Sequence, residues 1–463
     1  MFFARGLDGG IMTRRVDSGA TVDAQRNTVP IDRDTVRRIV ERQQFDLRRA
    51  SIREMNKLVN AIEQELGLPF IRMEFGVPGL PVDPLALEAE AAALGERGVG
   101  QFYAPFDGVP ALKEEAARFV KLFMDIEVPP SCCIPTIGAM EGCFAALALA
   151  GQIKRGRNKV ICLDPGFPVN KLQIRLLGLE RESVDFYDHR GDALVDAVER
   201  IARRGDACAV LWSSPNNPTW IVLKDSELAG LGRVCDRHDL LAIEDLAYFG
   251  MDVRQDYTRP GEPPFQPTVL RHTRNGICVI SSSKIFSYAG QRIALAVLSP
   301  ELMQKQAPDM LERLGTANVG HALIHGVLYP IAACVPESPQ YGLLALLREV
   351  NRGNSRLFRP AQEYARRARI VKRIFLDNGF TLVYDNDLGQ PLADGFYFTV
   401  AYPGYDDGAE LLNELLHYGI SAITLETTGS CRIEGLRACV SSIDDGQFDT
   451  LRARLQRFRE DHK

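Results

Sequence analysis

Four runs of apolar residues in the middle of the chain limit its fold more than any other feature. They occupy residues 159–163, 207–212, 240–243 and 277–280. Strands that are apolar on both faces are typical of parallel sheets, because helices cover both faces of such sheets. Helical stretches near 110–124 and 138–151 precede the first run. This alternation predicts an α/β fold with a mostly parallel sheet flanked by helices.

Polar residues or Gly-Pro turns follow directly after each apolar run. The four junctions are Asp164-Pro165-Gly166, Ser213 to Asn217, Glu244-Asp245 and Ser281 to Lys284. Ligands of open α/β sheets bind beyond the carboxyl ends of the strands. We therefore expect these junctions to meet at one edge of the sheet and to form a binding site there.

Length and composition narrow the class of protein. A chain of 463 residues is long for one core, so two domains that share a cleft are expected. With 46% apolar and 25% charged residues, the composition is that of a globular protein. The 55 basic and 60 acidic residues are mixed along the chain, which leaves no basic surface for nucleic acid or for an acidic membrane.

The predicted domain division follows the change in pattern along the chain. Residues 95–335 are predicted to form a large domain, and residues 29–94 together with 336–463 a smaller α+β domain. Residues 1–28 are predicted to be a flexible arm. Arg5 and Asp8 interrupt the apolar start, and no run approaches about 18 apolar residues. We therefore expect no signal peptide, no membrane span and a cytoplasmic location.

Cysteine and histidine spacing argues against a metal site. The ten cysteines include no CxxC pair, and reduced, mostly buried thiols are expected. His321 and His325 are four residues apart, a spacing that could place both on one helix face, but no third ligand lies nearby. We predict no metal.

One segment after the fourth apolar run resembles a known family. Ser281 to Ala294 is similar to the lysine signature of class I and II aminotransferases, with a hydroxyl residue three positions before Lys284 and Arg292 eight positions after it. Tyr288 departs from the pattern, which usually has an aliphatic residue there. A lysine that attacks an aldehyde must be available as a free amine, and burial beside a cation lowers its pKa.

Further motifs follow in the order of the aspartate-aminotransferase-like family. Each motif alone is weak evidence, but their order along the chain is specific to this family. The resemblance implies that pyridoxal 5'-phosphate (PLP) is bound covalently by Lys284, and that its other contacts on this chain come from Gly138, Ala139, Met140, Phe167, Asn217, Asp245, Tyr248, Ser281 and Arg292. Lys284, Asp245 and Tyr248 are then the catalytic residues. Segment 214–219 resembles the family's Asn-Pro-Thr-Gly segment, but Trp220 occupies the position of its glycine. The Trp220 side chain could therefore reach toward the substrate.

The resemblance also implies how the substrate binds and how the chain assembles. Arg437, with Gly76 and Asn217, would hold the substrate, and Arg432 is a rival for the carboxylate. Tyr103 would reach the cofactor of a partner chain, so a homodimer with shared sites is expected. The implied fold is that of PLP-dependent transferases, with a seven-stranded, mostly parallel sheet.

The implied activity is ping-pong transamination between an L-amino acid and a 2-oxo acid. A PLP-dependent lyase or ring-closing synthase on the same fold would use the same cofactor contacts, so both stay open. A third alternative is a non-catalytic PLP-binding module. A DNA-binding regulator is not expected, because no basic helix-turn-helix domain precedes the motifs.

Overall fold

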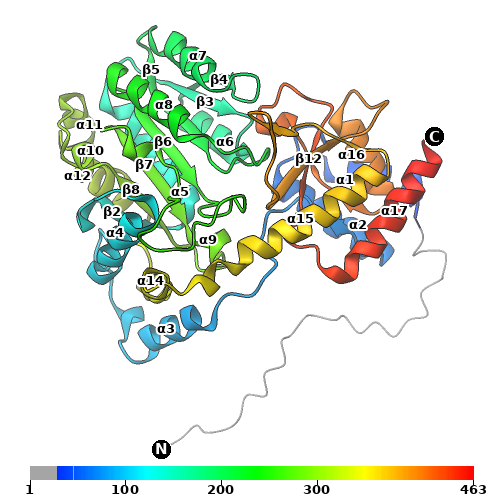
Figure 1. Cartoon of the computed structure of the whole chain (residues 1–463), viewed down its shortest axis with the longest axis horizontal. Helices are drawn as coiled ribbons and strands as arrows, with labels where there is room; N and C mark the ends of the chain where they lie inside the picture. The colour runs from blue at the N-terminus through cyan, green and yellow to red at the C-terminus, as the bar shows by residue number, and fades with distance from the viewer. Residues whose placement is uncertain (1–28, 45) are drawn as a thin grey trace, which may run out of the picture.

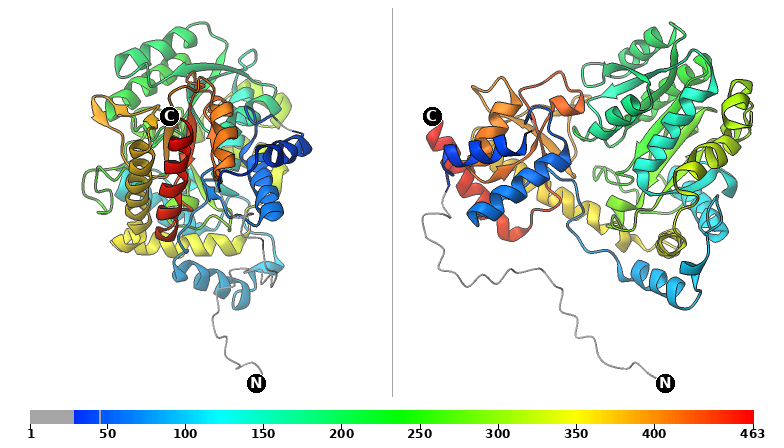
Figure 2. Two further views of the ribbon diagram at one scale, coloured as in Figure 1. Left: turned by 90° about the vertical axis from the view of Figure 1, so that its right-hand side faces the viewer. Right: turned by 180° about the vertical axis from the view of Figure 1, so that it is seen from behind.

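The computed structural model describes residues 29–44 and 46–463, which form a larger and a smaller unit side by side (Figure 1). The arm predicted at residues 1–28 lies outside the described residues. The long helix α15 (Arg359–Asp377) extends from the larger unit across the smaller one. Segments from both ends of the described chain meet in the smaller unit, where helices α1 (Arg33–Gln43) and α2 (Ile52–Leu66) lie beside the orange and red segments (Figure 2).

A seven-stranded sheet forms the centre of the larger unit. Its strand order is β2-β8-β7-β6-β5-β3-β4, and β8 is the strand that runs against the others. The strands are β2 (Cys133–Thr136), β3 (Lys159–Asp164), β4 (Glu180–Asp185), β5 (Ala207–Ser213), β6 (Leu241–Leu246), β7 (Gly276–Ser281) and β8 (Ala294–Leu298). The predicted α/β fold with a mostly parallel seven-stranded sheet is confirmed.

Helices cover both faces of this sheet. The core on one face includes side chains from α5 (Gly138–Ile153), α6 (Pro168–Leu176), α10 (Pro300–Gln304) and α12 (Val319–His321), and α11 (Leu311–Leu314) and α13 (Tyr329–Ala332) belong to the same stretch of chain. On the other face, the core includes α7 (Asp192–Ala202) and α8 (Asp225–His238). Val160 faces the first core and Ile161 the second, as the twofold alternation of a strand requires.

The smaller unit is an antiparallel sheet covered by helices from both ends of the chain. Its strand order is β14 (Ile423–Thr424), β15 (Leu436–Cys439), β12 (Tyr397–Ala401) and β9 (Thr381–Leu382). The helices are α1 (Arg33–Gln43), α2 (Ile52–Leu66), α15, α16 (Gly408–His417) and α17 (Phe448–Asp461). A parallel pair, β1 (Ile71–Arg72) with β13 (Ile420–Ser421), joins the N-terminal segment to this unit.

Local sequence explains where α2 begins and ends. The Ser51 side chain accepts a bond from the Glu54 amide, and the Glu54 carboxylate accepts one from the Ser51 amide. These reciprocal bonds satisfy two amides that have no partner within the helix. Gly67 then ends the helix at a φ of 66°, a conformation that glycine adopts without strain.

Two predicted features differ from the structure. The alternation of apolar and polar residues over 70–76 is typical of a strand. Only the two-residue β1 forms there, and beyond it the Met73 carbonyl accepts a bond from the Cys439 amide. Helices α3 (Pro84–Gly95) and α14 (Glu337–Asn351) share a core with α4 (Pro110–Met124), although the predicted division assigns them to the smaller domain. This packing argues for moving both boundaries, which themselves stay a prediction.

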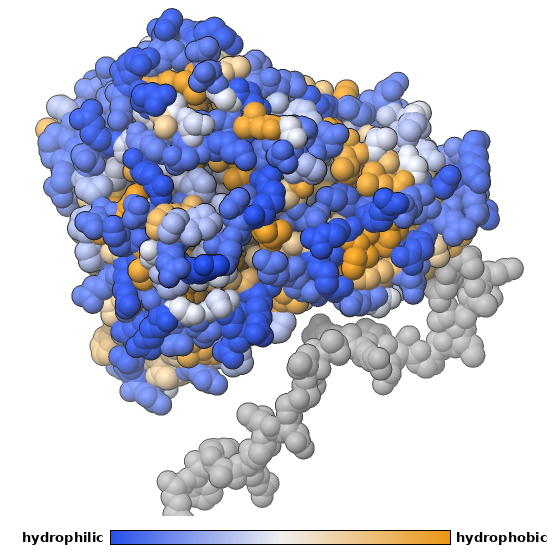
Figure 3. Space-filling model, in the orientation of Figure 1, coloured by the Kyte–Doolittle hydropathy of each residue, from blue (hydrophilic) through white to orange (hydrophobic). Residues whose placement is uncertain are grey.

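The molecular surface is mostly polar on the face that Figure 3 shows, with small apolar groups scattered over both units. Within the described residues, no helix is both long enough and apolar enough to cross a membrane.

Candidate active site

Lys284 lies just beyond the carboxyl end of β7, in the short helix α9 (Ser282–Ile285). Ser281 caps this helix by accepting a 3.1 Å bond from the Ser283 amide. The Lys284 ammonium donates a hydrogen bond to the Gly76 carbonyl, and it lies 5.5 Å from the centre of the Phe396 ring. Burial, with a smaller contribution from the nearby guanidinium of Arg292, lowers the pKa of Lys284 to about 8.

Asp245 lies beside Lys284 at the carboxyl end of β6. It is buried and accepts a 3.0 Å bond from the Ala247 amide. Burial raises the pKa of Asp245 to about 7, while the Lys284 charge acts in the opposite direction. The structure therefore brings two predicted catalytic residues together, and each is shifted toward its neutral form by loss of water.

Arg437, on β15, is a fully buried cation. One Nη donates to the Asn217 side-chain oxygen at 3.3 Å, and the other donates to the Glu74 carbonyl at 2.5 Å. Its Nε has no hydrogen-bond partner within the part of the chain that the structure describes. These acceptors are neutral, so the buried charge is stabilised by dipoles and by the face of Tyr397, whose ring centre lies 4.6 Å away.

Arg432, the rival for carboxylate binding, occupies a different place. It forms ion pairs with Asp185 at 3.2 Å and with Asp188 at 2.6 Å. Its guanidinium also lies over the rings of Tyr187 and Tyr384. Arg432 therefore already has acidic partners, whereas Arg437 does not.

Helix α5 begins directly after β2, and the backbone amides of its first turn lack the intrahelical partners that later amides have. Gly138, its first residue, has a φ of 73°, and a Cβ there would lie 2.3 Å from Nη2 of Arg292. Arg292 also donates a 2.8 Å bond to the Ala289 carbonyl. Ala139 and Met140 follow in the first turn. The helix N-terminus and this guanidinium together form a site suited to a phosphate group.

Tyr248 is buried, and its hydroxyl donates a 2.8 Å bond to that of Tyr397. Trp220 does not face an open substrate side. It is fully buried, and its ring centre lies 5.1 Å from that of Tyr248. Its φ of 67° keeps the turn that a glycine would make, and the indole packs against Gly395. The structure thus places this side chain in the core, because the smaller unit covers Trp220.

Phe167 and Tyr103 are not joined to this cluster in the same way. Phe167 is half-buried ahead of α6, where it lines a narrow pocket with Lys171 and Ser213. Tyr103 is 83% exposed in the single chain. The roles predicted for both residues stay predictions.

Comparison with known proteins supports one family. The chain matches the family "Aminotransferase class I and II" over residues 73–328, which is more than half of its length. The chain belongs to this family. A probable aspartate aminotransferase of Methanocaldococcus jannaschii is 23% identical over 347 residues, covering 75% of this chain and 82% of that one. An aspartate/prephenate aminotransferase of Thermus thermophilus is 27% identical over 254 residues, covering 54% and 62%.

Solved structures agree on the fold of this class I and II aminotransferase family member. An aspartate aminotransferase from Thermus thermophilus with maleate has a TM-score of 0.70 at 20% identity, over 91% of this chain and 98% of that one. An aspartate aminotransferase from Thermotoga maritima has a TM-score of 0.70 at 18% identity, over 91% and 99%.

Three residues of this family member's site were not singled out from sequence. Tyr397 contacts both Tyr248 and Arg437, and the Glu74 carbonyl accepts from Arg437. The buried Cys439 lies opposite Tyr397 in the β12–β15 ladder, and its thiol is within hydrogen-bond distance of the Ser441 hydroxyl. No motif in the sequence marks Tyr397, Glu74 or Cys439.

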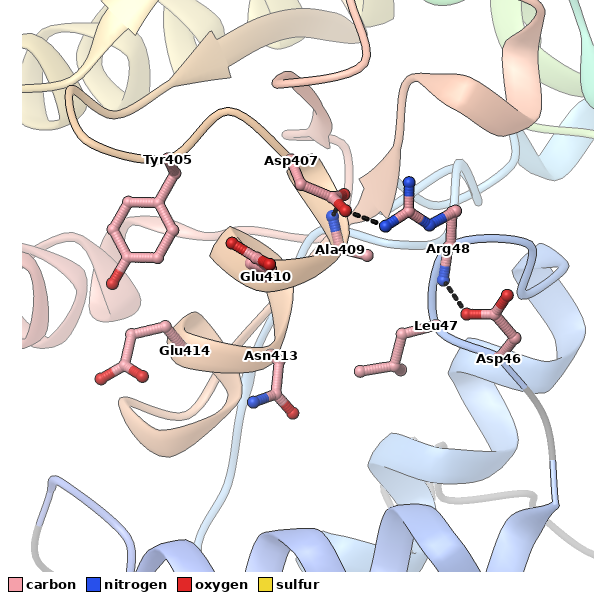
Figure 4. Close-up of a pocket in the computed structure, with 9 residues that line it drawn as sticks. All are labelled: Asp46, Leu47, Arg48, Tyr405, Asp407, Ala409, Glu410, Asn413 and Glu414. Atoms are coloured by element: carbon pink, nitrogen blue, oxygen red, sulfur yellow. Dashed lines mark hydrogen bonds and ion pairs between the residues drawn. The ribbon is translucent and has the colours of Figure 1, made fainter.

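A second concavity, of about 540 Å³, lies between the α1–α2 connection and α16, within the smaller unit (Figure 4). Its lining residues are Asp46, Leu47, Arg48, Tyr405, Asp407, Ala409, Glu410, Asn413 and Glu414. Arg48 forms an ion pair with Asp407. This concavity shares no lining residue with the cluster around Lys284.

The histidine pair also lies outside the active site. The His321 and His325 rings have centres 4.4 Å apart. Across residues 29–44 and 46–463, no three His, Cys, Asp or Glu side chains gather as a group that could hold a metal ion.

Proposed function

We propose that this aminotransferase family member uses PLP, bound covalently at Lys284, to move an amino group between an L-amino acid and a 2-oxo acid in a ping-pong reaction. The observation that carries the proposal is the state of Lys284. A lysine with a pKa near 8 supplies free amine close to neutral pH, as covalent and general-base chemistry requires. It also faces Asp245 at the sheet edge where ligands of such folds bind.

The residues at this edge fit the shape and charge of PLP. The missing side chain of Gly138 leaves room for Arg292 beside the amides of α5, and these groups with Ser281 would hold the phosphate. Asp245 would face the ring nitrogen, while Asn217 and Tyr248 would face the ring oxygen and Phe167 would stack on the ring. Once bound, PLP supplies the electron sink that lets the α-proton of an amino acid leave.

Arg437 would bind the substrate α-carboxylate. A buried guanidinium with neutral acceptors gains more from an arriving carboxylate than one that is already paired, such as Arg432. Gly76 and Asn217 would line the same place, because both contact this cluster. Lys284, once free, would carry the α-proton between substrate and cofactor.

A homodimer with shared sites belongs to the same proposal. Tyr103 is 83% exposed and its neighbour Phe102 is 72% exposed, and adjacent exposed aromatic residues are typical of interfaces. Light scattering of the purified protein should give about twice the chain mass. A monomeric mass at assay concentration would contradict this part of the proposal.

The test is an absorption titration of the purified protein with PLP, followed by amino acids added one at a time. Uptake of PLP with a visible band that certain donors convert to the pyridoxamine form supports transamination. Lys284→Ala should take up PLP without the covalent band. Lys305→Ala is the matched control, because Lys305 is also half-buried but bonds to Asn275 ahead of β7.

Product analysis separates the alternatives. Release of pyruvate and ammonia without an oxo-acid acceptor would instead identify a lyase, and loss of a sulfonium group would identify a ring-closing synthase. Uptake of PLP without turnover of any donor would indicate a binding module. A wild-type protein that takes up no PLP would refute the central proposal.

A further inference from the structure

Two groups of the candidate active site meet at one side chain that no family motif marks, Tyr397 on β12. In the ladder between β12 and β15, Tyr397 is opposite Cys439 and Thr399 is opposite Arg437. Tyr397 is therefore a diagonal neighbour of Arg437 on the same face of the sheet. This register places the Arg437 guanidinium 4.6 Å from the centre of the Tyr397 ring.

The Tyr397 ring supports a cation that has few other partners. The guanidinium has two neutral acceptors, on Asn217 and Glu74, and its buried Nε lacks one. An aromatic face attracts a desolvated cation more strongly than an exposed one. The ring therefore contributes to the orientation of Arg437 before any carboxylate arrives.

The Tyr397 hydroxyl supports Tyr248 as well. It accepts the 2.8 Å bond from the Tyr248 hydroxyl. Each phenol has one proton and two lone pairs, so the two hydroxyls can exchange donor and acceptor roles. When Tyr248 donates to another oxygen, Tyr397 can donate to Tyr248, and a hydroxyl that accepts a bond becomes a stronger donor.

Close packing leaves Tyr397 little freedom to move. A Cβ at Gly76 would lie 2.0 Å from the Tyr397 hydroxyl oxygen, so the segment that binds Lys284 lies directly against this phenol. On another side, the Trp220 ring lies 6.1 Å from the Tyr397 ring, edge to face. Trp220 is itself held over Gly395, where a Cβ would lie 2.0 Å from the indole.

We infer that Tyr397 is a positioning residue of the active site, which orients Arg437 through its ring and Tyr248 through its hydroxyl. Trp220 and Gly395 hold it in place. The inference rests on the proposed function, because it concerns how this chain prepares its carboxylate-binding and cofactor-facing groups. It also explains why a tryptophan occupies the glycine position of the Asn-Pro-Thr-Gly segment: the indole fills the space behind the two phenols.

Two substitutions separate the ring from the hydroxyl. Tyr397→Phe keeps the ring and removes the hydroxyl bond to Tyr248. We expect the pH at which the visible band of the PLP-loaded protein titrates to rise by about one unit, because Tyr248 becomes a weaker donor. The KM for the best amino donor should change by less than about threefold, since the face under Arg437 is kept.

Tyr397→Leu removes the ring under Arg437. We expect the KM for the same donor to rise about tenfold, because the guanidinium loses its aromatic support. If the leucine variant fails to fold, the phenylalanine variant still decides the question through the titration of the visible band. Thermal melting of both apoproteins checks folding independently of activity.

Tyr384→Phe is the matched control. Tyr384 is also a buried phenol in the smaller unit, bonded to Ser430 at 2.6 Å, with the Arg432 guanidinium 5.1 Å from its ring. It should change neither the titration nor the KM. If Tyr397→Phe titrates like wild type while wild type takes up PLP, Tyr397 is only a core residue and the inference is overturned. If wild type takes up no PLP, the proposed function fails and the inference fails with it.

Discussion

Two contacts between the larger and the smaller unit contain buried charges, and they differ in whether these charges have partners of opposite sign. One is made by the hairpin of β10 (Asn386–Asp387) and β11 (Gln390–Pro391). There the fully buried Asp387 accepts from Arg190 at 2.7 Å and from Arg254 at 2.8 Å. Arg190 also pairs with Glu227 and Arg254 with Asp252, so both cations and the central carboxylate have partners of opposite charge.

The candidate active site is the other contact, and its charges are incompletely paired. Among residues 29–44 and 46–463, Arg437 has only neutral acceptors and its Nε has no partner. Burial raises the pKa of Asp245 and lowers that of Lys284, and both changes favour the neutral forms. A buried charge without compensation lowers stability, and removing one partner of a buried pair leaves the other charge in that costly state. The comparison indicates that the charges of the hairpin contact are matched within the protein and fix the arrangement of the two units. The charged groups of the candidate active site lack such partners, so a bound ligand can supply them.

The largest expected effect comes from removing the Lys284 amine. Lys284→Ala should lower kcat for transamination by about 10⁴-fold, because both the covalent anchor and the proton carrier are lost. The melting temperature of the apoprotein should not fall, since the removed amine was unfavourably buried. Steady-state assays and thermal melting measure the two effects, with Lys305→Ala as control. A variant that keeps a tenth of the rate would contradict the role assigned to Lys284.

The next prediction tests the paired contact. Asp387→Asn should lower the free energy of unfolding by about 3 kcal/mol, because Arg190 and Arg254 lose a shared carboxylate in a buried place. Denaturant titration measures the change. Asp385→Asn is the control on the same hairpin, where the exposed carboxylate bonds only to the Tyr187 hydroxyl, and it should cost less than about 1 kcal/mol. Equal losses in the two variants would break the comparison.

A third substitution should have the opposite signature to Asp387→Asn. Arg437→Met should raise the KM for amino donors by about 100-fold, because a carboxylate loses its buried guanidinium. The melting temperature should stay level or rise, since an uncompensated cation is removed. Arg432→Met is the matched control, which should keep the KM within about threefold while losing stability. If Arg437→Met has a normal KM and Arg432→Met a raised one, Arg432 and not Arg437 binds the substrate carboxylate.

The smallest expected effect is a change with pH in the stability of the apoprotein, which we attribute to Asp245. Its pKa is raised from 3.8 to about 7, so the folded apoprotein resists ionisation that the unfolded chain accepts. This cost is absent below pH 4, grows as the pH rises and is fully present above pH 7. Asp245→Asn should therefore melt a few degrees above wild type at pH 8 and level with it near pH 4. If the difference in melting temperature between Asp245→Asn and wild type is the same at pH 4 and pH 8, the pKa of Asp245 is not raised.

The sheet was predictable because its signal is local. The apolar runs 159–163, 207–212 and 277–280 fall within β3, β5 and β7, since burial on both faces demands apolar residues in sequence. Strand β4 gave no such signal. It lies at the edge of the sheet and reads Glu180-Arg181-Glu182-Ser183-Val184-Asp185, so charged residues occupy solvent-facing positions there.

The site was predictable in part for the same reason. The polar junctions after β5, β6 and β7 carry Asn217, Asp245 and Lys284, and parallel strands bring their carboxyl ends to one edge. The role of Trp220 stayed open in the sequence because its environment comes from Gly395 and Tyr397, about 175 residues away in the chain. Chain order alone could not choose between Arg432 and Arg437, which are five residues apart.

The amino-acid sequence by itself determined the class of fold and pointed to the family, because each apolar run and each motif consists of residues close together along the chain. It also predicted Lys284 as the reactive lysine. Only the tertiary structure decided which arginine lacks an acidic partner, which phenol supports it and how far the pKa of Lys284 falls. These properties depend on loss of water and on partners from distant segments such as Glu74 and Gly76. Local sequence does not encode them, since burial exists only once the two units have packed together.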